Sequence, residues 1–147
     1  MAITQIDAPI RLDDLDAIVP FVQRLEDFDL AKIAVRWPGF RDDNGEVILD
    51  IHGEYHPIMS ELLAALYDHG FVRDFDWMKW QPRAERLYEH PELLKKARML
   101  TCVKLLTLHA RRDRFVDGHF ASMVQCGHIT AILRRMRDLG SASSNRT

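Results

Sequence analysis

The segment Met99–Leu108, M-L-T-C-V-K-L-L-T-L, most constrains what this chain can fold into. With helical spacing, its apolar side chains cover most of the circumference. Only a narrow polar stripe remains, formed by Thr101, Lys104, Thr107 and Arg111. A helix that is apolar nearly all round packs at the centre of a protein. The pattern therefore predicts a buried helix near residues 99–112, with the other helices packed around it.

Helical spacing of apolar residues predicts about six helices in all, counting the central one. Pro57 suits a first helical turn, and Gly70 suits the left-handed position that ends a helix. Pro20 falls inside the first helical pattern, where it either kinks the helix or begins its main body. The predicted helices besides the central one cover residues 12–25, 57–69, 83–89, 118–125 and 128–139.

Two segments near the N-terminus have the alternating pattern of β-strands. They are Lys32–Trp37 and Glu46–His52, and the sequence D-D-N-G at residues 42–45 between them favours a turn. We therefore expect an α+β fold that is mainly α, with a small N-terminal β-hairpin. Residues 1–140 are expected to form a single globular domain, and the polar residues 141–147 a disordered tail.

Length, apolar runs and cysteine content indicate which class of protein this chain belongs to. The chain has 147 residues, and none of its apolar runs approaches the roughly 18–20 residues of a membrane span. The first ten residues do not have the pattern of a signal peptide. The two cysteines, Cys102 and Cys126, fall in predicted helices and form no C-x-x-C pair, so we interpret them as small buried hydrophobes in a reducing compartment. These features favour a cytoplasmic protein without a membrane partner.

Charge is divided unevenly along the chain. Residues 1–60 contain 5 Lys or Arg and 12 Asp or Glu, whereas residues 61–147 contain 15 and 10. A basic half can indicate a nucleic-acid face, but the sequence pI of about 6.4 is far below that of typical nucleic-acid binders. Attraction between the two halves, within one domain or across a dimer, explains the same asymmetry.

A distinctive motif follows the central helix. The sequence L-L-T-L-H-A-R-R-D-R-F-V-D-G-H-F runs from Leu105 to Phe120, and G-H-I-T-A-I-L-R-R-M follows from Gly127. Together with Y-D-H-G-F at residues 67–71 and the tryptophans after Phe75, it resembles a family of small bacterial proteins of unknown function over about residues 60–140. The family pattern is roughly L-T-x-H-x-R-x-x-R-F-x-x-G-H. The resemblance implies motif positions at Arg111, Arg114, Phe115, Gly118 and His119, and no activity.

The best candidate site within this motif is a basic corner made by Arg111, Arg112, Arg114 and His119. Guanidinium groups bind phosphate and carboxylate through two parallel hydrogen bonds, and the predicted helix 118–125 begins alongside. A nucleotide, a nucleic-acid backbone or an acidic partner would fit such a corner. Arginines at the end of a helix also bond its last carbonyl groups, so a purely structural corner is the alternative.

Other candidate sites are weaker. Trp77 and Trp80 are three residues apart and could stack on a ligand ring, although aromatic packing is the commoner role. His52 and His56 are four residues apart, but they fall in a strand end and loop that contains Gly53, so no metal site is predicted. His109 lies on the same face as Cys102 and Leu105 and is expected to be a core histidine. The sequence contains no phosphate-binding glycine loop and no nucleophile motif, and no cofactor is predicted.

Three classes of function follow from these observations. The first is a binding or adaptor module whose arginine corner holds an anionic ligand or partner. The second is a homo-oligomeric interaction protein that uses the tryptophans or the oppositely charged halves. The third is a small enzyme in which His119 acts as acid or base beside Arg111 and Arg114.

Overall fold

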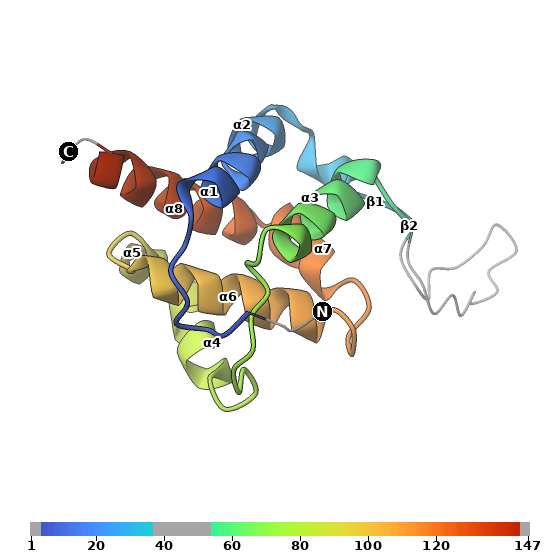
Figure 1. Ribbon diagram of the computed structural model, residues 1–147. Helices are drawn as coiled ribbons and strands as arrows, with labels where there is room; N and C mark the ends of the chain where they lie inside the picture. Colours follow the sequence, from blue (N-terminus) through green and yellow to red (C-terminus); the bar gives the residue numbers. More distant parts are fainter. Residues whose placement is uncertain (1–3, 37–53, 145–147) are drawn as a thin grey trace, which may run out of the picture.

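The computed structural model describes residues 4–36 and 54–144, and the fold is mainly helical (Figure 1). The predicted first helix is divided at Pro20, which begins a second helix, since proline suits a first turn but cannot continue one. The helices are α1 Leu12–Ile18, α2 Pro20–Asp27, α3 Pro57–Asp68, α4 Gln81–Glu89, α5 Pro91–Leu94, α6 Met99–Arg112, α7 His119–Gln125 and α8 His128–Ser144, with a short 3-10 turn at Leu30–Lys32.

The predicted β-hairpin is not seen as proposed. Its second strand, 46–52, lies outside the described residues. The short strand β1, Ala34–Arg36, instead pairs antiparallel with β2, Glu54–Tyr55, a segment that the sequence pattern assigned to a loop. The backbone N–H of His56 also donates to the carbonyl of Ile33, at 2.8 Å, and so extends the pairing toward α3.

The core lies around α6 and α8. In Figure 1 the two helices cross the molecule, with α1 and α2 beside α8 and with α4 on the other side of α6. Helix α8 contacts α1, α2, α5, α6 and α7, and α6 contacts α4, α7 and α8. The prediction of a buried α6 is confirmed, since every residue from Cys102 to Ala110 except Lys104 is buried. Thr107 was assigned to the polar stripe of this helix and is fully buried instead.

The last helix is longer than predicted. Helix α8 continues to Ser144, beyond the predicted helix end at residue 139, and 145–147 lie outside the described residues. The predicted helix end at residue 139 lies directly before Gly140. A Cβ atom on this glycine would lie 2.5 Å from Cδ2 of Leu15, so the absence of a side chain lets α1 pack against α8. Gly140 therefore serves helix packing rather than helix termination.

The two cysteines differ in environment. Both are free; Cys102 is buried as predicted, whereas Cys126 is exposed at the end of α7. The prediction for Cys126 was wrong because this residue lies at the turn between α7 and α8, where its thiol donates to the carbonyl of Met123. Among the described residues, no helix has the length and apolar character needed to span a membrane.

Candidate functional site

The corner between α6 and α7 is fixed by Gly118 and Asp113. Gly118 has φ 85°, a left-handed conformation that disfavours residues with a side chain, and it directly precedes the first residue of α7. The backbone N–H of Phe120 donates to Oδ1 of Asp113 over 2.9 Å. A carboxylate of the chain itself therefore occupies the beginning of α7, where the sequence suggested room for an external anion.

Three histidines from three helices meet next to this corner. His109 lies on α6, whereas His119 and His128 are the first residues of α7 and α8. Nδ1 of His109 lies 2.9 Å from Nε2 of His119, which is hydrogen-bonding distance. The ring of His128 meets the ring of His109 edge to face, with centroids 5.1 Å apart. We call these three residues the histidine cluster.

The protein environment keeps the histidine cluster neutral. Burial, and then the neighbouring His128, His119 and Arg112, hold the pKa of His109 well below its usual value of 6.5. Burial, followed by Arg112 and His128, lowers the pKa of His119 to about 4. Burial lowers the pKa of His128 to about 4 as well. At neutral pH each imidazole therefore has one N–H donor and one bare nitrogen acceptor.

Two nitrogens of this cluster lack a hydrogen-bond partner among the described residues. Nε2 of His109 and Nε2 of His128 are buried, and neither has a partner in the part of the chain that the structure describes. His109 is only 4% exposed, so water does not freely replace the missing partner. A buried polar atom without a partner costs about 1–3 kcal/mol, and a ligand that supplied the partner would recover that free energy.

A cavity of about 230 Å³ opens beside the histidine cluster, between α4, α6 and α7. We call it the histidine cavity. Apolar side chains of Ala84, Leu108 and Met123 form part of its wall. Its polar lining is Gln81, Glu85, Tyr88, His109, Arg112 and His119.

The predicted arginines are divided between different environments. Arg112 lines the histidine cavity together with His119, so two of the predicted site residues share one cavity. The guanidinium of Arg114 instead lies over the ring of Tyr67 on α3, 5.6 Å from its centroid, in a cation–π contact. Arg111 is half-buried and does not line the histidine cavity. The structure therefore joins Arg112 with His119 and separates them from Arg114.

The two predicted tryptophans each contact a different aromatic ring. Trp77 lies 6.0 Å, centroid to centroid, from Phe115. Trp80 meets Phe75 edge to face at 6.0 Å, and the ammonium group of Lys104 lies 5.8 Å from the Trp80 ring. Both tryptophans are half-buried and pack against the core, and neither lines the histidine cavity.

Of the histidine pair His52 and His56, the described member, His56, has a structural role. His52 lies outside the described residues. Nδ1 of His56 accepts a hydrogen bond from the N–H of Ile58 and so caps α3, and its ring packs on Phe28 at 4.5 Å. Within residues 4–36 and 54–144, no three His, Cys, Asp or Glu side chains are arranged to hold a metal ion.

Sequence reasoning missed His109 and His128 as members of a common site. A usable signal was present, because Gly118-His119 and Gly127-His128 are the same dipeptide at two successive helix corners. Both glycines have positive φ angles, 85° and 89°. Each corner turns through glycine and begins the next helix with histidine, and both histidines then reach His109 on α6.

The model of a family of unknown function, DUF6508, matches residues 10–142. The chain belongs to this family. The match includes the whole histidine cluster and all four residues of the predicted basic corner. No curated protein and no solved structure matches.

Proposed function

We propose that this DUF6508 protein is a binding module whose histidine cavity holds a small anionic group. The observation that carries the proposal is the buried Nε2 of His109, which has no hydrogen-bond partner within residues 4–36 and 54–144. His109 lines the same cavity as Arg112. The arginine would supply the charge, and the imidazoles would supply directed hydrogen bonds. The ligand would be a phosphate or carboxylate group, either free or at the end of a larger molecule.

The hydrogen bond between His109 and His119 suggests how the cluster would bind an anion. A neutral imidazole has a single N–H, so His109 either donates or accepts at Nδ1. If His119 donates from Nε2 to Nδ1 of His109, then the hydrogen of His109 is at Nε2, where an anion oxygen can accept it. An anion in the cavity would therefore favour this one arrangement of hydrogens.

The size and lining of the cavity restrict the ligand. A volume of about 230 Å³ lies below the roughly 300–1,000 Å³ of cavities that enclose drug-sized ligands. The carboxylate of Glu85 also lines the cavity and would repel an anion bound next to it. We therefore expect one singly or doubly charged group close to Arg112, with any remaining part of the ligand extending outward.

Titration calorimetry with inorganic phosphate tests this proposal. The informative variant is Arg112→Gln, and Arg111→Gln is the matched control, because it removes the same charge from the neighbouring position outside the cavity. Loss of a charge-assisted hydrogen bond should weaken binding at least about tenfold in Arg112→Gln and leave Arg111→Gln near wild type. Equal weakening in both variants would indicate a general charge effect and would contradict the proposed site.

The nucleic-acid form of this hypothesis makes a different prediction. A nucleic-acid backbone would contact the surface arginines, so its binding would fall steeply with salt and would weaken in an Arg111→Ala, Arg114→Ala double variant. The guanidinium of Arg114, however, already makes a cation–π contact with Tyr67 within the protein, which argues against a role in holding a nucleic-acid backbone. We therefore favour a small anion. Binding to a mixed-sequence oligonucleotide that the double variant leaves unchanged would exclude the nucleic-acid form.

A homo-oligomeric interaction domain is the second candidate, and one observation favours it. Phe115 is 72% exposed and Val116 is 48% exposed in the corner loop, and Phe115 contacts the half-buried Trp77. Exposed apolar groups of this kind often mark contact surfaces. Sedimentation of wild type and Phe115→Asp tests the idea, since a dimer that the variant converts to monomer supports it and a monomeric wild type contradicts it.

An enzymatic role for His119 receives less support. A general acid or base works best with a pKa near the pH of operation, whereas the pKa of His119 is lowered to about 4. We also propose a cytoplasmic location, in agreement with two cysteines that form no disulfide.

A further inference from the structure

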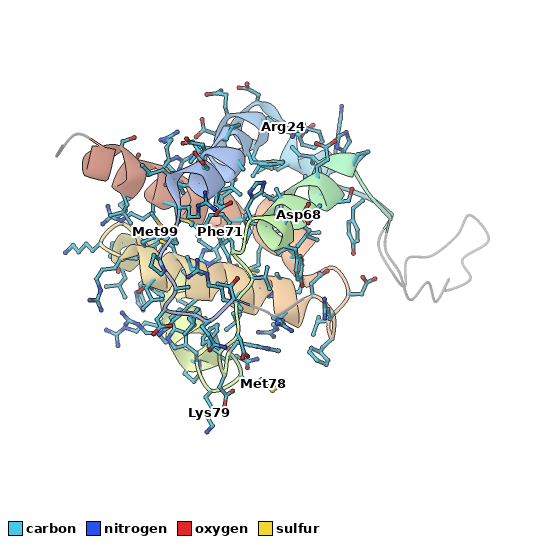
Figure 2. All side chains as sticks on the ribbon, in the orientation of Figure 1. Arg24, Asp68, Phe71, Met78, Lys79 and Met99 are labelled. Atoms are coloured by element: carbon cyan, nitrogen blue, oxygen red, sulfur yellow. The ribbon has the colours of Figure 1, made fainter. Side chains whose placement is uncertain are left out.

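A second cavity, of about 460 Å³, lies at the opposite end of α6 from the histidine cavity. The N-terminal segment before α1 runs across α6 and forms one wall, and the start of α6 and the end of α8 form others (Figure 1). In Figure 2, Met99 marks the start of α6 at this place. Most of the lining is apolar, and the exposed Asp7 adds one carboxylate from the N-terminal segment. The apolar side chains include Leu12, Leu15, Met99, Leu100, Val103 and Leu139.

One cationic side chain, Arg73, also lines this cavity. Arg73 is only 4% exposed. Its Nε donates to the carbonyl of Gly70 over 2.8 Å, and one terminal nitrogen, Nη1, donates to the carbonyls of Ile6 and Ala8. These bonds attach the N-terminal segment to the end of α3. They use three of the five N–H groups of a guanidinium.

The charge of Arg73 has no direct carboxylate partner among the described residues. Every hydrogen bond that its guanidinium makes with the described residues goes to a neutral backbone carbonyl. Burial lowers its pKa, while the more distant Asp14 and Asp7 act in the opposite direction. Asp14 pairs with His69 at 2.9 Å. Asp7 lines the same cavity as Arg73, but its side chain is exposed, so solvent screens its charge. A buried cation of this kind is stabilised when an anion joins it.

We propose that this second cavity, which we call the Arg73 cavity, binds a medium-chain carboxylate. The carboxylate group would accept hydrogen bonds from Nη2 of Arg73, which makes none with the described residues, and the alkyl chain would lie between α1, α6 and α8. Charge complementarity selects an anion, and the apolar walls select an alkyl tail. The volume lies within the range of natural ligand cavities. This site is separate from the histidine cavity and does not depend on the function proposed for it.

Decanoate is the probe for this site, with decanol as its uncharged equivalent. We expect decanoate to bind and to shift the methyl NMR signals of Leu100, Val103 and Leu139, with no shift at Leu108 or Met123 in the histidine cavity. Decanol should bind at least about tenfold more weakly, because it lacks the charge that Arg73 recognises. A dissociation constant for decanoate weaker than about 1 mM would overturn the proposal. Decanol that binds as tightly as decanoate would overturn it as well.

Two surface variants keep the test independent of folding. Leu100 lines the cavity at a partly exposed position, so Leu100→Glu should abolish decanoate binding without unfolding the protein. Met78→Glu is the matched control, because Met78 is exposed at the loop before α4, far from Met99 (Figure 2). Arg73→Gln should weaken binding at least about tenfold if it folds. Binding that survives Leu100→Glu, or methyl shifts confined to the histidine cavity, would contradict the proposed site.

Discussion

At the scale of single residues, Thr107 shows how one hydroxyl connects distant parts of the chain. Its Oγ1 donates to the carbonyl of Phe71 and accepts from the N–H of Arg73, both at 3.0 Å. The Thr107 side chain is fully buried, and so is that of Phe71, which is labelled near the middle of the molecule in Figure 2. The same connection positions Arg73 beside the second cavity.

Thr107→Val should therefore destabilise the protein although the two side chains have nearly the same shape. The change leaves a buried carbonyl and a buried N–H without a partner, and we expect the free energy of unfolding to fall by about 2 kcal/mol or more. Thr107→Ser retains the hydroxyl and should lose less. Urea denaturation measures both variants, and a Thr107→Val protein as stable as Thr107→Ser would contradict this role.

At the scale of elements, α6 contributes the most deeply buried side chains. Leu105 is fully buried, whereas Leu100 at the start of the same helix is 39% exposed. Leu105→Ala should lower the free energy of unfolding by about 2–5 kcal/mol, and Leu100→Ala, the matched control, by clearly less. Thermal and urea denaturation compare them. Similar losses in the two variants would show that burial along α6 is not as described.

The start of α7 depends on Asp113. Burial raises the pKa of this carboxyl group, and the N–H of Phe120 acts in the opposite direction. Asp113→Ala removes the acceptor and should destabilise the protein by about 1 kcal/mol. Asp113→Asn keeps an acceptor oxygen and removes a partly buried charge, so it should be at least as stable as wild type at pH 7. If Asp113→Asn loses as much stability as Asp113→Ala, the charge itself is required at this corner.

At the scale of the whole molecule, the histidine cluster should make global stability depend on pH. The pKa values of His119 and His128 are about 4 in the native protein and about 6.5 in unfolded chains, so the unfolded state binds more protons between these values. The free energy of unfolding should therefore fall as the pH is lowered from about 6.5 to about 4. Urea denaturation at a series of pH values measures this dependence.

The variant His119→Gln should flatten this profile, since it removes one of the groups that becomes protonated on unfolding. The exposed His90 provides the matched control, and His90→Gln should follow the wild-type profile. A wild-type profile that stays level over this pH range, or parallel profiles for wild type and His119→Gln, would contradict a neutral buried cluster.

Much of this fold could be predicted from local pattern, and the site only in part. The helical periodicity of α6 and the proline at the start of α3 are local signals, and both indicated the correct element. The burial of Thr107 and the role of Gly140 depend on partners in other elements, namely Phe71, Arg73 and Leu15. Local pattern contains no information about such partners. For that reason Thr107 was assigned to a polar stripe, and the last helix was expected to end before Gly140.

The same reason explains why only some of the predicted site residues lie together. Arg112 and His119 lie within seven residues of each other, so a motif could suggest both. Arg114 and Arg112 are closer still in sequence, yet one contacts Tyr67 on α3 and the other lines the histidine cavity. His128 reaches the cluster only because α7 and α8 turn back on α6.

The most direct test of the histidine cavity is a long-range ¹H–¹⁵N NMR spectrum of the imidazole rings at pH 7, recorded with and without inorganic phosphate. Without phosphate, His109, His119 and His128 should give neutral-ring signals. Phosphate should shift the signals of His109 and His119, while His69 and His90, which lie outside the cavity, stay in place. Cluster histidines that are protonated at pH 7, or that do not respond to phosphate, would contradict the proposal that this cavity is an anion-binding site.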